Sequence, residues 1–334
     1  MKYFIILFSL GISGFATAQS LPSALLNGSA QLAGSGNVGG KSGDFTGIAE
    51  LQVTTEPKND WFMVMRGNLE YNDPKIKLNK LFIQSNLSSH SQARVGYHVV
   101  DFGSFGETKN FESLNAPIYI GLLYDILEST GLLGRDIRVS YFSLKPQHSL
   151  QGPWYGSTGV GSGPGAQHSL AGKLGYFSSE ALDVSFSALV KHYRFLLKKE
   201  WLGVADFYVQ SNWDPVVIGL EGVWGMEPIQ TQWLRDQGEN KKFAYFRGAR
   251  FDLKHLFKMD SEESFETKFS FELMRPDSST PRLQAARYAL GGNYVFVPVS
   301  LGVEANVIVS NSRLNLSKKE WDQSNLKFRM KYVF

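Results

Sequence analysis

The stretch N-L-K-F-R-M-K-Y-V-F, residues 325–334, decides the fold. Its apolar side chains fall on alternate positions, and the cations Lys327, Arg329 and Lys331 fall between them. Because successive side chains of a strand point to opposite faces, the stretch predicts a strand with one apolar and one cationic face. An edge strand of a soluble sheet would show the same pattern. The fold class therefore depends on whether the rest of the chain repeats it.

The alternation recurs along most of the chain, in about sixteen segments of roughly ten residues each. They are 24–33, 45–55, 61–71, 76–87, 92–102, 136–143, 152–161, 168–177, 182–194, 201–211, 216–225, 241–253, 265–274, 283–296, 299–309 and 325–334. A strand that crosses a bilayer needs about nine to eleven residues, whereas strands of soluble proteins average about five or six. The segment lengths favour an all-β, transmembrane antiparallel β-barrel of about sixteen strands.

Two of these segments are irregular. The glycine-rich segment 152–161 alternates poorly, and it is counted as a strand because the total is then even, as in single-chain outer-membrane barrels. Within 76–87 the apolar positions change phase, so we expect a β-bulge near Asn79.

The first residues have the pattern of an export signal. Lys2 precedes the apolar run 4–10, and Ala16-Thr17-Ala18 forms a small-residue cleavage site. The apolar run is too short to span about 30 Å of hydrocarbon, which argues against a membrane anchor. We expect residues 1–18 to be a cleaved signal peptide and residues 19–334 to form one outer-membrane β-barrel.

Composition excludes several other classes of protein. The 334 residues include no cysteine and carry a formal net charge of +3, which does not suggest a nucleic-acid partner. No stretch after the signal reaches eighteen apolar residues, so a helical inner-membrane protein is excluded. The six histidines lack zinc-ligand spacing, and the glycine-rich run 156–165 lacks the lysine ending of a nucleotide loop. We expect no cofactor, no metal site and no enzymatic activity.

The connections indicate how the barrel is oriented. If the first strand rises from the periplasm, the short turns fall on the periplasmic side, as in outer-membrane barrels. The longer connections then fall outside; they lie near residue 41 and at 106–134, 226–240, 276–281 and 311–323.

A barrel of sixteen strands is too wide to fill with side chains and encloses an aqueous lumen. The polar face of each strand lines that lumen. The predicted pore-lining cations are Arg66, Arg94, Arg138, Lys173, Lys242, Arg250, Lys268, Arg287, Lys327, Arg329 and Lys331; the acids on the same face are Glu50, Glu70, Asp183, Asp206, Glu221, Asp252, Glu266, Glu272 and Glu304. Either the charges of this wall pair with one another and the pore selects no ion, or the column of cations on the last strand makes the pore prefer anions.

The longest outer connection, 103–134, has an apolar middle at 117–127 that an exposed loop would not carry. We expect the loop to fold against the inner wall and to narrow the lumen. Its acids Glu107, Glu112, Asp125 and Glu128 would then face arginines of the wall. The alternative is a loop that packs on a neighbouring subunit or on top of the barrel.

Together, the export signal, the amphipathic strands, the long third loop and the terminal aromatic resemble a Gram-negative outer-membrane porin. Residues 93–107 (ARVGYHVVDFGSFGE) and 134–141 (GRDIRVSY) resemble porin O/P-type members, which implies selectivity for phosphate or polyphosphate. Outside residues 327–331 the chain lacks an obvious basic ladder of that kind. The resemblance also implies a homotrimer, contact with outer-membrane lipid and lipopolysaccharide, and recognition of Phe334 by the barrel-assembly machinery.

The expected function is passive diffusion of small hydrophilic solutes or ions through a water-filled barrel that loop 103–134 narrows, with a possible preference for anions. A substrate-specific channel for phosphate or another anion, a non-conducting structural or adhesive barrel, a transporter of hydrophobic compounds and a soluble exported β protein remain alternatives.

Overall fold

The computed structural model describes most of the chain outside its first 23 residues. The described ranges are 24–37, 43–55, 61–70, 73–104, 127, 132–133, 135–144, 152–163, 166–178, 181–195, 198–226, 228–238, 243–260, 263–276, 283–312 and 325–333.

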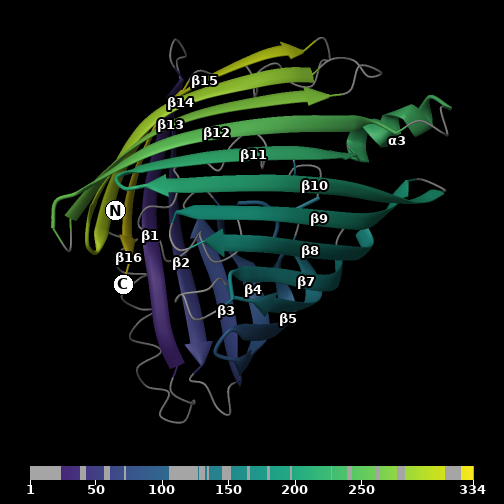
Figure 1. Cartoon of the computed structure of the whole chain (residues 1–334), viewed down its shortest axis with the longest axis horizontal. Coiled ribbons are helices and arrows are strands. Elements are labelled where there is room, and N and C mark those ends of the chain that lie inside the picture. Colours follow the sequence, from purple (N-terminus) through teal and green to yellow (C-terminus); the bar gives the residue numbers. More distant parts are fainter. Residues whose placement is uncertain are drawn as a thin grey trace.

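Within these ranges sixteen strands form one antiparallel sheet (Figure 1). The strands are β1 (Ala24–Asn37), β2 (Gly43–Thr55), β3 (Trp61–Glu70), β4 (Asp73–Ser88), β5 (Ser91–Val99), β6 (Arg135–Ser143), β7 (Trp154–Gly163), β8 (Ala166–Ser178), β9 (Leu182–Phe195), β10 (Lys198–Trp213), β11 (Val216–Met226), β12 (Tyr245–Lys258), β13 (Glu263–Pro276), β14 (Leu283–Phe296), β15 (Val299–Ser312) and β16 (Asn325–Val333). Their lengths of nine to sixteen residues are those of membrane-spanning strands.

The sheet closes on itself. Each strand pairs with its neighbours in the sequence, and β1 also pairs with β16, with Gln31 opposite Lys331. Closure leaves no edge of unpaired backbone groups, which is the condition for a sheet to exist in hydrocarbon. The predicted antiparallel barrel of about sixteen strands is confirmed.

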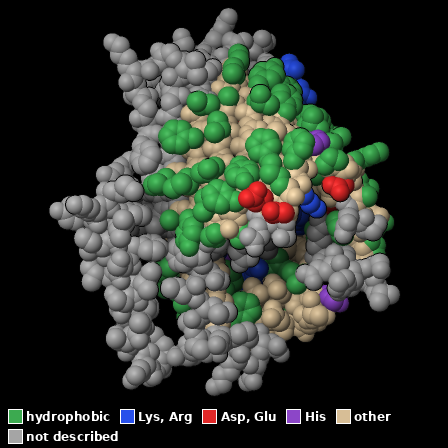
Figure 2. Space-filling view, turned by 90° about the vertical axis from the view of Figure 1, so that its left-hand side faces the viewer, with side chains coloured by type: hydrophobic (Ala, Val, Ile, Leu, Met, Phe, Trp, Pro, Cys, Tyr) green, Lys and Arg blue, Asp and Glu red, His purple; other side chains and the backbone are tan. Residues whose placement is uncertain are grey.

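The side chains alternate between the two faces as the sequence pattern predicts. On β3, Met63 and Met65 are each 41% exposed, whereas Val64 and Arg66, which alternate with them, are 6% and 7% exposed. The exposed members are apolar on strand after strand. Figure 2 shows such hydrophobic side chains gathered over one face of the molecule, with few charged side chains among them. This is the outer surface of a barrel that fits hydrocarbon.

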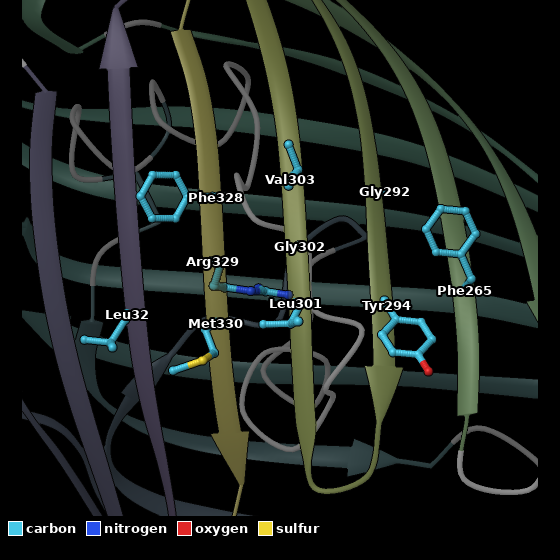
Figure 3. A pocket seen from close by; sticks show the side chains of 10 residues that line it. All are labelled: Leu32, Phe265, Gly292, Tyr294, Leu301, Gly302, Val303, Phe328, Arg329 and Met330. Atoms are coloured by element: carbon cyan, nitrogen blue, oxygen red, sulfur yellow. The ribbon is translucent and has the colours of Figure 1, made fainter.

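The outer face has a hollow where the barrel closes. An apolar depression of about 630 Å³ lies over β13–β16 and β1, lined by Leu32, Phe265, Tyr294 and other residues (Figure 3). Gly292 contributes no side chain there. Arg329 belongs to the opposite face of β16, and its register partner Gly302 has no side chain to obstruct it.

The predicted bulge is confirmed at the expected residue. Arg66 pairs with Lys80, but the next residue, Gly67, pairs with Leu78. Asn79 is therefore skipped, and the apolar phase of β4 changes there because one extra residue rotates the side chains that follow.

The glycine-rich segment is a strand, displaced by two residues from the predicted range. It is β7, which pairs with both β6 and β8. A Cβ atom at Gly161 would lie 2.6 Å from Arg138 Cγ, and one at Gly159 would lie 2.4 Å from Ser140 Oγ. The glycines thus leave room for the inward side chains of β6. Because glycine is neither apolar nor polar in its side chain, β7 lacks the clear alternation of the other strands.

The connections correct two expectations. Short links follow β7 and β9 on the side predicted to carry the longer loops, and β6 and β7 are joined by a longer link on the other side. The link after β3, on the longer-loop side, is also short, as the turn residues Asn72-Asp73-Pro74 predict. The connection from β11 to β12 contains a helix, α3 (Pro228–Asp236), and β12 starts at Tyr245 rather than at residue 241. No helix among the described residues is long and apolar enough to cross a membrane.

Two polar contacts hold α3 to the ends of the strands. Arg235 donates to both carboxylate oxygens of Glu200 on β10 at 2.9 Å, and its guanidinium lies 4.9 Å from the ring centre of Phe243. The backbone N–H of Ala244 donates to Thr231 Oγ1 at 3.2 Å. These contacts depend on long-range packing, which explains why strand periodicity alone did not predict the helix.

Candidate functional site

The chain that leaves β5 turns into the barrel. Gly103 N–H donates to Ser187 Oγ on β9 at 3.1 Å. Ser104 donates twice to Glu221 on β11, from its N–H at 2.9 Å and from its hydroxyl at 3.1 Å. Because β11 is six strands away from β5 around the barrel, this segment must cross the interior to reach it.

A second set of contacts fixes the same segment to β7 and β8. Asp101 accepts from Ser157 Oγ at 3.0 Å and lies 3.5 Å from Lys173 Nζ. Lys173 also donates to the carbonyl of Gly103 at 2.8 Å. Lys173, predicted as a pore-lining cation, therefore faces inward and anchors the start of loop 103–134.

Two described residues of this connection, Leu127 and Leu132, are buried in an apolar cluster with Phe102, which precedes the loop. Leu127 and Leu132 are each 0% exposed and Phe102 is 1% exposed. They belong to one cluster with inward residues of β8–β14: Ala171, Leu189, Tyr193, Leu202, Val204, Val223, Phe246, Met274 and Ala285. Burial of these apolar side chains stabilises the contact between the described residues of the connection and the inner wall.

The sequence analysis missed this apolar inner patch. Near one end of β9–β14 both faces of the sheet are apolar, so the alternation that marks the inner face disappears there. A run such as Ala188–Leu189–Val190, which has no polar position, indicates in the sequence that the inner face is apolar there.

The inner face of β12–β15 carries a group of six ionised side chains, which we call the paired wall: Arg250, Asp252, Lys268, Glu272, Arg287 and Glu304. Arg287 donates to Glu272 at 2.6 Å, to Glu304 at 2.7 Å and to Asn306 at 2.7 Å. Arg250 lies 2.7 Å from Asp252, which also lies 3.5 Å from Lys268. Each cation of this group has a carboxylate partner.

Register explains the pairing. Glu221, Arg250, Glu272 and Arg287 face one another in turn across β11–β14. Directly opposed side chains of an antiparallel pair have Cβ atoms about 4.5–5.5 Å apart, so charges of alternating sign stabilise one another.

A smaller buried network joins β6, β8 and β9. Arg138 donates to Asp136 at 3.1 Å, to Ser169 Oγ at 2.8 Å and to the carbonyl of Gly159 at 3.1 Å. Lys191 lies 3.1 Å from Asp136. Asp136 and Lys191 were not among the predicted wall charges, although each has the inward parity of its strand.

The inner faces of β3–β5 and β16 differ from the paired wall. They carry Arg66, Lys80, Arg94, Lys327, Arg329 and Lys331, which we call the cationic wall. Among the side chains that the structure describes on these four strands, none of the inward ones is acidic. The predicted acids Glu50 and Glu70 lie on β2 and β3, and their side chains are outside the described part.

Arg94 shows how a cation of this wall is held. Its Nε donates to Gln84 Oε1 at 2.8 Å, and its guanidinium lies 5.1 Å from the ring centre of Phe82 and 4.5 Å from that of Phe142. Aromatic faces stabilise a cation without neutralising its charge.

The predicted site residues are placed as follows. Ten predicted pore-lining cations have inward parity on their strands: Arg66, Arg94, Arg138, Lys173, Arg250, Lys268, Arg287, Lys327, Arg329 and Lys331. The predicted constriction acids Glu107, Glu112, Asp125 and Glu128 lie outside the described residues, as do Lys242 and Phe334. No group of three or more His, Asp or Glu side chains in the described ranges is arranged to hold a metal ion.

Comparisons with known proteins agree with this architecture. No protein-family model matches the sequence, and no curated protein matches it either. Solved structures do match over almost their whole length. The outer membrane channel DcaP of Acinetobacter baumannii has a TM-score of 0.65 at 12% identity, covering 94% of this chain and 99% of that one.

Two further structures are similar. The anion-selective porin from Comamonas acidovorans has a TM-score of 0.63 at 10% identity, and the trimer form of OmpT from Vibrio cholerae has a TM-score of 0.62 at 9% identity. Each comparison covers 93% of this chain and 99% of the other. The chain thus has the fold of the Gram-negative outer-membrane porins, as its sequence pattern predicts.

Proposed function

We propose that the chain is an outer-membrane porin. Residues 1–18 direct export and are removed, and residues 19–334 form a barrel in the outer membrane through which small hydrophilic solutes or ions diffuse passively. The observation that carries this proposal is a closed barrel with an apolar outer face and a charged inner face. Such a sheet satisfies its backbone groups in hydrocarbon and offers a polar lining to water.

Loop 103–134 narrows the lumen in this proposal. The contacts of Gly103 and Ser104 with Ser187 and Glu221 hold its beginning against the inner wall, and buried Leu132 holds its end. The acids Glu107, Glu112, Asp125 and Glu128 are proposed to face the lumen from this loop.

The channel prefers anions in this proposal. The six charges of the paired wall sum to zero, and the six of the cationic wall are all positive. On the described strands as a whole, inward lysines and arginines outnumber inward aspartates and glutamates, so the lining as proposed attracts anions. One protein with a similar fold is described as an anion-selective porin, which supports the proposal without identifying a solute.

The assembly is proposed to be a homotrimer in contact with outer-membrane lipid and lipopolysaccharide, with Phe334 recognised by the barrel-assembly machinery. The trimer form of the Vibrio cholerae protein supports the subunit number.

One observation favours a barrel that does not conduct. Arg138, Lys191 and Arg287 on the inner face are only 0–2% exposed, so other atoms cover them. A barrel filled across its whole section would be structural or adhesive.

Planar-bilayer conductance of the detergent-folded full chain separates these functions. A porin gives discrete conductance steps, and a salt gradient gives a reversal potential on the anion side. Deleting residues 117–127 should raise the step size because the loop no longer narrows the lumen. Absence of steps from trimeric, folded protein would overturn the channel, and an unchanged step size after the deletion would remove the loop from the constriction.

A further inference from the structure

Arg247 and Arg275 are unusual because they point away from the lumen. On β12, Arg247 alternates with inward Phe246, which is 2% exposed; on β13, Arg275 alternates with inward Met274, which is 5% exposed. Both arginines are exposed. Among the described strand side chains, every other lysine or arginine has inward parity, so the two outward cations stand out from an otherwise apolar surface.

Register places these two arginines directly opposite each other on adjacent strands. Like charges opposed in this way destabilise a sheet pair. Among the described outward side chains next to them on β11–β14, none is acidic; Glu263, outward on β13, lies at the other end of the strand. An anion that accepts hydrogen bonds from both guanidinium groups would remove the repulsion.

The position of the pair along the strands is that of a membrane boundary. Arg247 is the third residue of β12 and Arg275 the last but one of β13, at the end of the strands where α3 lies. Trp224 on β11 is the register partner of Arg247, is 57% exposed and stacks on Tyr245 at 5.8 Å with an interplanar angle of 11°. Exposed aromatic side chains mark the level of lipid headgroups on such barrels.

We infer that Arg247 and Arg275, flanked by Trp224 and Tyr245, bind the phosphorylated headgroup of a glycolipid in the outer leaflet. Guanidinium groups match phosphate oxygens through paired hydrogen bonds. The apolar surface of β11–β13 continues below the pair toward the other end of the strands, where the acyl chains of the same lipid would lie. The inference rests on the proposed outer-membrane location and assigns residues to a contact that the porin proposal leaves general.

The test uses native mass spectrometry of the detergent-folded full chain with bisphosphorylated lipid A. The wild-type chain should retain the lipid, and R247Q/R275Q should bind it at least about tenfold more weakly, because charge-assisted hydrogen bonds to phosphate are lost. Dephosphorylated lipid A with the same acyl chains should bind the wild type no better than it binds the variant. K254Q/K258Q is the matched control: it removes two positive charges from the other end of β12 and should leave binding unchanged.

Several results would overturn the inference. The first is equal binding of the lipid by the wild type and R247Q/R275Q, and the second is an equal loss of binding in K254Q/K258Q. The third is displacement of the lipid by millimolar inorganic phosphate. The fourth is a change of oligomeric state in R247Q/R275Q, which would assign the arginines to a subunit contact. Bilayer conductance of the same variants keeps the two proposals separate: R247Q/R275Q should conduct like the wild type, and a wild type that binds lipid A but does not conduct would refute only the channel.

Discussion

The paired wall and the cationic wall contain similar cations, but the side chains that contact those cations differ. In the paired wall, Arg287 lies between Glu272 and Glu304 at 2.6 and 2.7 Å. In the cationic wall, Arg94 lies beside Gln84 and two aromatic rings. The first arrangement stabilises the barrel and cancels its own charge. The second places the cation against an amide and two aromatic rings, and in our proposal the strands of the cationic wall set the selectivity. The two walls meet where Glu304 on β15 lies opposite Lys327 on β16.

The largest expected effect is the loss of one member of the paired wall. Glu272→Gln removes a buried carboxylate, 0% exposed, that forms an ion pair with Arg287 and lies 4.0 Å from Arg250. Breaking a buried ion pair in this way costs roughly 3–5 kcal/mol because the remaining charge stays buried. The urea midpoint of the folded barrel should fall accordingly. Glu266→Gln on the same strand, at a half-buried position, is the control; equal midpoints for the two variants would refute the special role of the pairing.

A second prediction concerns the attachment of loop 103–134 to the wall. Glu221→Ala deletes the acceptor of both Ser104 hydrogen bonds. Two hydrogen bonds to a charged group contribute together at least about 3 kcal/mol, so release of the segment should become at least roughly a hundredfold more frequent. Open-channel current noise should increase. Ser104→Ala should add little further noise to Glu221→Ala, since the partner is already gone; fully additive effects would show that the two residues act separately.

The third prediction addresses the cationic wall. Substituting glutamine for Lys327, Arg329 and Lys331 should lower the anion-to-cation permeability ratio by about fivefold, taking about 1 kcal/mol for the combined attraction of the column on an ion in water. Reversal potentials under a salt gradient measure the ratio. The double variant R250Q/E272Q, which changes no net charge, should leave it near the wild-type value. A larger shift from this double variant than from the triple variant would reverse our assignment of the two walls.

The smallest effect is expected where aromatic rings hold a cation. Arg94→Lys keeps the charge but loses the planar contact with Phe82 and Phe142, which we expect to cost about 0.5–1 kcal/mol. The urea midpoint should move slightly and the permeability ratio should not. A change of selectivity would mean that the geometry at Arg94, beyond its charge, acts on the passing ion.

Most of the barrel could be predicted from the sequence because a membrane-facing strand must alternate. The segment lengths, the phase change at Asn79 and the inward parity of the wall cations all follow from this requirement. The prediction of inward and outward faces was less accurate where inward side chains are apolar. Leu189 and Val223 are apolar and inward because they pack against the loop, and no local pattern shows a loop that arrives from elsewhere in the chain.

The partners of the charged groups could not be predicted for the same reason. Arg138 reaches Ser169 on β8 across β7 because the glycines of β7 leave space, and Ser104 donates to a carboxylate 117 residues further along the chain. Such pairings depend on register and on the path of the chain through the interior. Whether an inward cation is neutralised is therefore a property of the folded barrel.

The closure between β1 and β16 also bears on how the protein is made. Ser29 pairs with Val333, about three hundred residues away, so the final ring of hydrogen bonds must wait until nearly the whole chain is available. Such distant contacts are slow to form because the entropy of a very long loop opposes them. Until then two strand edges stay open to pairing with other chains. A shortened chain without β16 should accordingly aggregate or be degraded, instead of persisting as a slightly narrower barrel.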